Sequence, residues 1–313
     1  MKVQSVSSAL IKELNRVVVG QPELSYMLTV CMLAGGHALI EGAPGLGKTL
    51  AARTLAKASG VPFKRVQFTP DLMPSDIVGT SVFDAASGQF VLRKGPIFTS
   101  FLLADEINRT PPKTQSALLE AMEENRVTID GVSHSLDQPF MVFATQNSIE
   151  YEGTYPLPEA QLDRFMMKLI VGYPPRQEAH RLLQNVQHGF DAQTIAEVET
   201  VASATDILDA RAEVKTVRVE DSLLGYVLDM LDVTRADHNI QLGASPRAGI
   251  ALLTAGKVVA LMNGRDFCVP EDFRQVAGQI LRHRIILTPD AEIEGITPDH
   301  ALELALSRVP VPR

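Results

Sequence analysis

The chain has 313 residues and a mass of 34.1 kDa, enough for one large domain and a smaller one. Apolar residues make up 45% of it, which is enough to fill a hydrophobic core and excludes a wholly disordered protein. The 29 Lys and Arg residues against 37 Asp and Glu residues give a formal charge of −8. We therefore do not expect nucleic acid as the partner, although the net charge does not exclude a local basic groove.

The cysteine content and the apolar stretches bear on the compartment. Cys31 and Cys268 are the only cysteines, and they stand far apart in apolar surroundings. Two such thiols give no disulfide framework and no metal-ligand set, so we expect reduced core residues in a cytoplasmic protein. The apolar stretch over 26–40 is interrupted by Gly35 and Gly36. Since a membrane-spanning helix needs about 20 consecutive apolar residues, we expect no membrane insertion.

The first predicted elements are two helices. Leu10, Leu14 and Val17 recur at helical spacing, and a second helix is expected from Pro22 to about Leu33. Short apolar runs without polar alternation follow, which is typical of strands covered on both faces of a parallel sheet. Helical patterns separate several of these runs, so the sequence predicts an α/β layer fold. The apolar runs lie at 38–40, 66–68, 100–104, 141–144 and 168–171.

Two segments interrupt the alternation of strands and helices. Glycines punctuate short apolar stretches over about 76–96, which predicts an inserted β-hairpin. A second hairpin is predicted over about 127–136, with Asp130 and Gly131 near its turn. Both hairpins would project from the α/β layers.

The C-terminal part of the chain has a different pattern. The last sheet-like run ends before the prolines at 174–175, and from about Asp221 onward only helical periods appear. We therefore expect a core domain over 1–178, a polar helical connector over 179–220 and a small all-helical domain over 221–313.

A glycine-rich segment after the first predicted strand carries the most specific signal. Two glycines separated by four residues and followed by Lys48 and Thr49 fit a phosphate-binding loop, because glycines let backbone N–H groups curl around phosphate oxygens. Lys48 supplies a cation to the β- and γ-phosphates, and Thr49 offers a hydroxyl to Mg²⁺. The apolar run before the loop and the helix after it are the required context. The residues expected to contact the nucleotide here are Gly42, Ala43, Pro44, Gly45, Leu46, Gly47, Lys48, Thr49 and Leu50.

Polar side chains end two further predicted strands. Asp105 and Glu106 follow a buried run, and a carboxylate at a neighbouring strand end can hold Mg²⁺, the role that we expect for Asp105. Glu106 is then free to polarise the attacking water. Asn147 ends the other strand and is expected to hydrogen-bond the γ-phosphate or that water. Its open alternative is an ordinary turn-forming Asn.

These motifs, in this order, resemble those of the AAA+ ATPases and more narrowly those of the MoxR family. The resemblance covers most of the chain, and the two predicted hairpins are similar to the family's helix-2 and pre-sensor-1 inserts. It implies a P-loop αβα sandwich with a five-stranded parallel sheet and a helical lid, which binds ATP or ADP with Mg²⁺. The motifs that carry the resemblance are the Walker A loop at 42–49, the Walker B strand at 101–106 with its continuation to 115, and the segments 144–147, 157–165 and 243–248.

The resemblance also implies roles for single residues. Asn147 takes the sensor-1 position, and Arg247 takes the sensor-2 position beside the nucleotide. Arg164 lies at the arginine-finger position, which reaches into a neighbour's site. Val18 and Val19 lie where the family packs the adenine. For each arginine a surface salt bridge is the open alternative.

The function that the resemblance implies is ATP hydrolysis coupled to remodelling, maturation or metal insertion of a partner protein, a chaperone-like activity. Family members assemble into rings, here expected to be hexamers, and work with proteins that contain a von Willebrand factor A-type domain. Two alternatives stay open: a nucleic-acid ring motor and a nucleotide-switched assembly scaffold, although the intact Glu106 argues against the scaffold. The sequence names neither the partner nor any inserted metal. It also leaves open whether the hairpins or the lid bind that partner.

Overall fold

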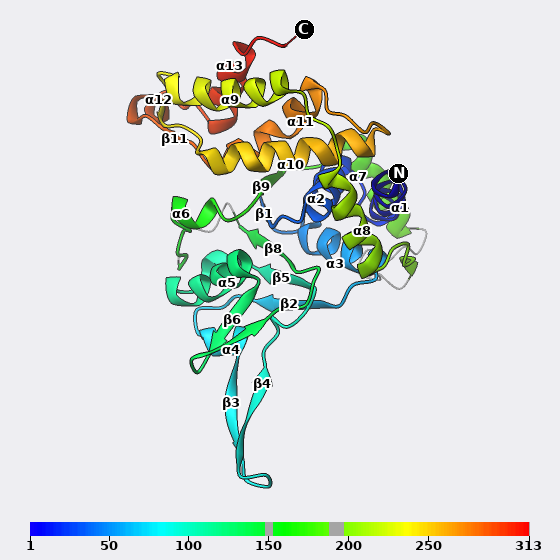
Figure 1. Ribbon diagram of the computed structural model, residues 1–313, viewed down its shortest axis with the longest axis vertical. Coiled ribbons are helices and arrows are strands. Elements are labelled where there is room, and N and C mark those ends of the chain that lie inside the picture. The colour runs from blue at the N-terminus through cyan, green and yellow to red at the C-terminus, as the bar shows by residue number, and fades with distance from the viewer. Residues whose placement is uncertain (148–152, 188–196, 313) are drawn as a thin grey trace.

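The computed structural model describes residues 1–147, 153–187 and 197–312 (Figure 1). At its centre lies a five-stranded parallel sheet in the order β2-β5-β8-β1-β9. Each predicted apolar run overlaps one of these strands, so the predicted five-stranded α/β sheet is confirmed. The strands are β1 (Ala38–Gly42), β2 (Phe63–Gln67), β5 (Phe101–Asp105), β8 (Met141–Gln146) and β9 (Met167–Val171).

The two faces of the sheet bury different side chains. Along β5, Phe101 and Leu103 join one hydrophobic cluster, whereas Leu102 and Ala104 join the other. This division follows from the two-residue period of a strand. Phe101 also packs edge-on against Phe143 of β8, with ring centroids 4.8 Å apart. Burial on both faces explains why β5 and β8 appear in the sequence as continuous apolar runs, whereas the edge strand β2 exposes Lys64 and Arg65.

Helices cover both faces of the sheet. One face packs against α2 and α3, and α1 packs on these two helices; the buried side chains of all three share a cluster with Phe101 and Leu103. The other face packs against α5, with Leu118, Leu119 and Met122 buried. The described helical elements up to residue 187 are α1 (Lys2–Val17), α2 (Pro22–Ala34), α3 (Lys48–Ala58), α4 (Pro74–Val78), the 3₁₀ turn η1 (Ile107–Arg109), α5 (Pro112–Glu124), α6 (Glu159–Leu162) and α7 (Arg176–Gln187).

The region expected to be a connector contains a helix that packs against the core. In α8 (Ala204–Lys215), Ile207, Ala210 and Val214 are buried, and the helix contacts α1 and α2. Their three- and four-residue spacing places all three side chains on one face of the helix. This part of the segment therefore belongs to the packed body of the protein.

Two antiparallel hairpins lie in the segments where the sequence predicts inserts. The hairpin of β3 (Gly79–Asp84) and β4 (Gln89–Lys94) projects away from the body of the protein (Figure 1). The hairpin of β6 (Arg126–Ile129) and β7 (Val132–Ser135) is shorter. At its turn Asp130 and Gly131 have φ of 49° and 79°, the two positive values that a tight hairpin turn requires.

The C-terminal domain is a helical lid, as predicted, with one addition. A short antiparallel ladder joins β10 (Ile240–Leu242) to β11 (Ile286–Leu287). Strands of two or three residues are too short to show a two-residue period, so the sequence pattern did not indicate them. The helices of the lid are α9 (Asp221–Ala236), α10 (Pro246–Met262), α11 (Pro270–Leu281), α12 (Pro289–Ile293) and α13 (Pro298–Ser307). Within the described residues, no helix of this domain or of the core is long and apolar enough to span a membrane.

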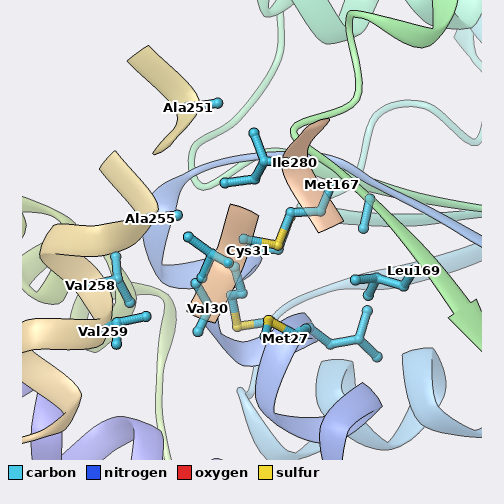
Figure 2. Close-up of a cluster of buried hydrophobic side chains, with 14 of the residues drawn as sticks. Met27, Val30, Cys31, Met167, Leu169, Ala251, Ala255, Val258, Val259 and Ile280 are labelled. Atoms are coloured by element: carbon cyan, nitrogen blue, oxygen red, sulfur yellow. The ribbon is translucent and has the colours of Figure 1, made fainter. Parts of the chain in front are cut away.

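Figure 2 shows part of the apolar cluster at which the lid meets the core. Met27 and Cys31 of α2 and Met167 of β9 lie near Ala255 of α10 and Ile280 of α11. These residues belong to one continuous hydrophobic cluster that spans both domains. Because burial of apolar surface is the main favourable term in folding, this cluster holds the lid against the edge of the sheet.

A buried histidine stands where β1 begins. The Nδ1 atom of His37 accepts a hydrogen bond of 2.9 Å from the backbone N–H of Val142, and its Nε2–H donates to the backbone oxygen of Met122 at 3.0 Å. Burial lowers the pKa of His37 from 6.5 to about 4. The folded protein therefore holds this imidazole neutral, with both ring nitrogens engaged.

We expect acid to destabilise the fold partly through His37. Below pH 6.5 the unfolded chain protonates this side chain, whereas the folded protein does so only near pH 4. Stability from this group is therefore complete above pH 6.5 and falls as the pH is lowered towards 4, by at most about 1.4 kcal/mol per pH unit. Urea unfolding should be measured between pH 4.5 and 7.5. As the pH is lowered over this range, the free energy of unfolding should fall less steeply for His37→Gln than for the unchanged protein. The exposed His300→Gln should keep the original slope; an unchanged slope in His37→Gln would contradict the assignment.

Candidate functional site

The loop between β1 and α3 surrounds an open cavity of about 500 Å³. Gly45 and Gly47 have φ of 82° and 81°, a region that glycine adopts without strain. No described heavy atom lies within 4 Å of a Cβ built on either residue, so the backbone here faces open space. Since α3 begins at Lys48, the unpaired N–H groups of its first turn and the positive end of its dipole lie at this loop. Besides residues 44–50, the cavity is lined by Arg53, Arg65, Gln67, Asp105, Glu106, Thr145 and Asn147.

Lys48 is held within the loop by backbone oxygens. Its Nζ atom donates to the carbonyl of Gly42 and, at 3.1 Å, to the carbonyl of Gln146. A side chain at position 42 would not fit, because a Cβ there would stand 2.5 Å from the backbone oxygen of Val171. The ammonium group thus spans the ends of β1 and β8, at the rim of the cavity.

Asp105 lies at the centre of a polar cluster. It is buried, and its carboxylate accepts hydrogen bonds from Thr145 Oγ1 at 2.5 Å and from Thr49 Oγ1 at 3.2 Å. Arg65 forms an ion pair with the same carboxylate at 2.7 Å. The acidic group expected to hold a metal is therefore fixed by two hydroxyls and one cation.

Glu106 stands at the rim of the same cavity. Its backbone has a φ of 58°, and its N–H donates to Thr145 Oγ1 at 2.9 Å. Its carboxylate accepts from Gln67 Nε2 at 2.7 Å and pairs with Arg109 at 3.3 Å. The Thr145 hydroxyl consequently links the backbone of Glu106 to the side chain of Asp105.

The parallel sheet explains why these residues meet. The carboxyl ends of β2, β5 and β8 lie at one edge, with Gln67 beside Asp105 and Ala104 beside Ala144. In open α/β sheets, ligands bind outside this edge. Arg65, Gln67 and Thr145 were not among the predicted site residues. Thr145 could have been found as a polar residue at the end of an apolar run, whereas Arg65 and Gln67 lie in a strand of mixed polarity and give no such signal.

The other predicted site residues divide into those that line the cavity and those that do not. Asn147 and Leu50 both line it, and Asn147 is buried. Val18 is buried in the core, Val19 is half-buried, and the described residues that line the cavity include neither of them.

The two predicted arginines meet each other at a different place. Arg164 and Arg247 both pair with Glu123, at 3.2 Å and 2.9 Å. The hydrogen bond from Arg247 holds the pKa of Glu123 below its usual range. Both arginines line a second cavity of about 320 Å³, whereas the described lining of the Lys48 cavity includes neither of them. Within one chain, the structure therefore does not bring Arg247 to the predicted nucleotide site.

The residues around the first cavity fit a nucleotide with Mg²⁺. The open glycine backbone, the helix N-terminus and Lys48 suit phosphate oxygens. The Thr49 hydroxyl and the Asp105 carboxylate, 3.2 Å apart, are the oxygen donors that Mg²⁺ takes alongside phosphate. This donor set and the parallel sheet define a P-loop nucleotide-hydrolysing protein of the AAA+ class.

Comparisons with known proteins specify that class. The family described as the ATPase family associated with various cellular activities matches residues 37–167, and the AAA lid domain matches residues 232–304. The chain is 40% identical to the chaperone MoxR1 of Mycobacterium tuberculosis over 96% of this chain and 81% of that protein. It is 46% identical to the uncharacterised protein YeaC of Bacillus subtilis, over 96% and 93% of the two chains.

A solved structure agrees in both fold and sequence. The crystal structure of a predicted ATPase from Cytophaga hutchinsonii matches with a TM-score of 0.89 and 43% identity, over 100% of this chain and 97% of the other. The protein MoxR of Methylorubrum extorquens is 30% identical over 96% of this chain and 94% of its own length. The chain belongs to the MoxR family of AAA+ ATPases, and its activity is that of an ATPase.

We expect Thr145→Val to lower the rate of ATP hydrolysis. The change removes the hydroxyl that joins Asp105 to the backbone of Glu106 at a buried position, which leaves polar groups unpaired and costs about 1–3 kcal/mol of stability. Steady-state kinetics should show a reduced kcat with a smaller change in KM. Thr145→Ser keeps the hydroxyl and is the matched control, expected to be close to the unchanged protein. Full activity in a folded Thr145→Val protein would mean that the bridge does not orient the carboxylates.

Proposed function

We propose that this protein is a Mg²⁺-dependent ATPase that couples hydrolysis to the remodelling, maturation or metal insertion of a partner protein. The observation that carries the proposal is the gathering of Lys48, Thr49, Asp105 and Glu106 around one open cavity. In P-loop enzymes, positioning and electrostatic stabilisation supply most of the catalysis of phosphoryl transfer. The local arrangement supports that chemistry without any covalent step on the protein.

Each residue has a separate role in this proposal. The backbone of residues 42–50 and the Lys48 ammonium bind the phosphates, while Thr49 and Asp105 hold Mg²⁺. Bound Mg²⁺ would neutralise charge that develops on the transferred phosphoryl group. Glu106 orients and polarises the attacking water, and Asn147 hydrogen-bonds that water or the γ-phosphate.

Both carboxylates already have partners that a bound metal ion or water would meet. Arg65 pairs with Asp105 through the same Oδ2 atom that Thr49 approaches, and Gln67 occupies one oxygen of Glu106. A metal ion held by Asp105 would compete with the Arg65 guanidinium for that oxygen. Likewise, a water molecule at Glu106 competes with Gln67.

We expect Lys48→Ala and Glu106→Gln to fail at different steps. Lys48 meets the ground-state phosphates, so its loss should abolish nucleotide binding. Glu106 acts on the water, so Glu106→Gln should bind ATP normally and hydrolyse it about 10²–10⁴-fold more slowly. Binding of a fluorescent ATP analogue and release of phosphate measure the two steps. Hydrolysis at the original rate by Glu106→Gln would refute the role of Glu106.

We further propose that the chain works as a ring of six identical copies, as the resemblance to the family implies. Arg164 and Arg247 lie together on Glu123, outside the described lining of their own nucleotide cavity. Because Arg164 does not line its own nucleotide cavity, we propose that it acts in trans, so that a neighbouring copy receives its guanidinium group at the γ-phosphate. A finger of this kind contributes about 10³–10⁵ in rate.

We expect two inactive variants to restore activity when mixed. Lys48→Ala chains keep Arg164 but lack a working nucleotide site, and Arg164→Ala chains have the converse defect. A mixed ring places some intact sites opposite intact arginines, so ATPase activity should recover in part and vanish on dilution that separates the copies. An intrachain salt bridge with Glu123 would instead be worth at most about 1 kcal/mol, and its loss would leave Arg164→Ala active.

The partner is proposed to bind at the hairpins. Four apolar side chains near the tip of the β3–β4 hairpin are exposed, and loops or hairpins on a rigid scaffold commonly carry recognition. The naming of one relative as a chaperone supports this class of function. A partner with a von Willebrand factor A-type domain and a cytoplasmic location, where ATP is supplied, complete the proposal. The exposed side chains are Val82, Phe83, Phe90 and Val91.

We expect replacement of residues 82–91 by a short Gly/Ser linker to separate the two functions. The hairpin lies outside the nucleotide cavity, so basal ATPase activity should be kept. Capture of the partner by the ATP-loaded Glu106→Gln protein, measured by mass spectrometry of the bound fraction, should be lost. Glu106→Gln with an intact hairpin is the control. Unchanged capture would move the partner site to another surface, with the lid as the next candidate.

A further inference from the structure

One buried arginine of the lid is bonded almost entirely to the core. Arg284 follows α11, and its side chain is 3% exposed. Its guanidinium donates to Asp163 Oδ1 at 2.6 Å and to three backbone oxygens of the core, those of Asp163 at 3.2 Å, Phe165 at 2.8 Å and Met166 at 3.0 Å. A further bond to the carbonyl of Ile280 ties it to its own helix.

The segment that Arg284 holds is the one that carries Arg164. The acceptors Asp163 and Phe165 stand directly on either side of Arg164 in the chain. His283 adds a hydrogen bond of 3.0 Å between its Nε2 atom and the backbone oxygen of Phe165. The backbone around Arg164 is thus fixed from the lid and not only from the sheet.

Asp163 also connects this contact to the second arginine. Its Oδ2 atom lies 3.7 Å from Arg247 Nη1, while its Oδ1 atom accepts from Arg284. Arg247 in turn shares Glu123 with Arg164. Consequently, the Asp163 carboxylate links Arg284 to Arg247, and the Glu123 carboxylate links Arg247 to Arg164.

The bonding favours a role in geometry over a role in stability alone. A buried ion pair seldom stabilises a protein more than well-packed apolar side chains of similar volume would. A planar guanidinium with several fixed donors does, however, define orientation as well as distance, whereas a hydrophobic contact has little directional preference. The lid already has an apolar cluster that attaches it to the core.

We propose that Arg284 is a positioning residue through which the lid sets the place of Arg164. Movement of the lid carries the 163–166 segment with it, so that the state of one copy's lid determines how Arg164 meets the neighbour's nucleotide. The inference rests on the proposed action of Arg164 in trans. It adds a residue and a route by which neighbouring sites communicate.

Mixed assemblies test this route. The parent pair is Lys48→Ala with Arg164→Ala, in which recovered ATPase activity depends on Arg164 of the Lys48→Ala chain. Adding Arg284→Gln to the Lys48→Ala chain should lower the recovered activity about 10- to 100-fold, because small displacements of a catalytic group have effects of this size. Adding Arg284→Gln to the Arg164→Ala chain instead should leave the recovery close to that of the parent pair. A purely structural role would reduce both mixtures alike.

A second measurement needs neither nucleotide nor ring. Hydrogen exchange followed by mass spectrometry should show faster exchange of the amides at 163–167 in Arg284→Gln. The matched control is Arg282→Gln, which breaks an ion pair of 2.9 Å with Asp299 inside the lid and leaves the Asp163 contact intact. It should change neither the exchange at 163–167 nor the mixing results. If Arg284→Gln does not assemble, Arg284→Lys replaces it, since an ammonium cannot reach all four acceptors of the core at once.

The outcomes separate the two proposals. Suppose that activity recovers in the parent pair, but that Arg284→Gln has no effect or causes the same loss in either chain. The role of Arg284 is then overturned, and the action of Arg164 in trans is not. No recovery in the parent pair despite demonstrated co-assembly refutes the action of Arg164 in trans, and this inference with it. Unchanged exchange at 163–167 in Arg284→Gln also overturns the role of Arg284.

Discussion

The hydroxyl of Thr145 joins the two acidic residues of the site, and its position follows from the parallel pairing of β5 with β8. It donates to the buried carboxylate of Asp105 and accepts from the backbone of Glu106. Parallel strands bring their carboxyl ends to one edge, where the side chains that follow each apolar run leave the core together. A slip of one residue would turn every inward side chain outward, so the hydrophobic packing of Phe101 on Phe143 also maintains the polar geometry of the site.

The phosphate-binding cavity and the arginine pair lie on different parts of the same chain. Lys48, Asp105 and Glu106 line the first cavity, whereas Arg164 and Arg247 share Glu123 beside a second. Guanidinium groups of this kind can stabilise negative charge where it develops during hydrolysis. The proposed division of a site between neighbouring copies would make activity depend on assembly.

The lid contacts the core in two chemically different ways. Apolar side chains of α10 and α11 pack on α2 and β9 (Figure 2), which supplies attraction with little directional preference. Arg284 and His283 instead bond to backbone oxygens on both sides of Arg164. The first contact holds the lid in place, and the second relates its orientation to one side chain. Neither depends on the nucleotide cavity itself.

Local patterns in the sequence determined the phosphate-binding loop, the five strands and the turn of the second hairpin. Residues 42–49 are consecutive, and a strand buried on both faces is a continuous apolar run. Asp130 and Gly131 form the turn of the β6–β7 hairpin. Each of these signals is therefore contained within a few positions of the chain. The MoxR resemblance rested on such motifs in their order along the chain.

Only the tertiary structure decided which distant residues share a hydrogen bond. Thr145 and Asp105 are 40 positions apart, and Arg284 and Asp163 are 121 apart. The sequence placed Arg247 beside its own nucleotide, whereas the fold pairs it with Glu123, 124 positions away. A polar residue gives no periodic signal of its own, and its partner depends on strand order and on how the lid packs. That is why the loop could be predicted from its residues alone, while the partners of its arginines required the folded chain.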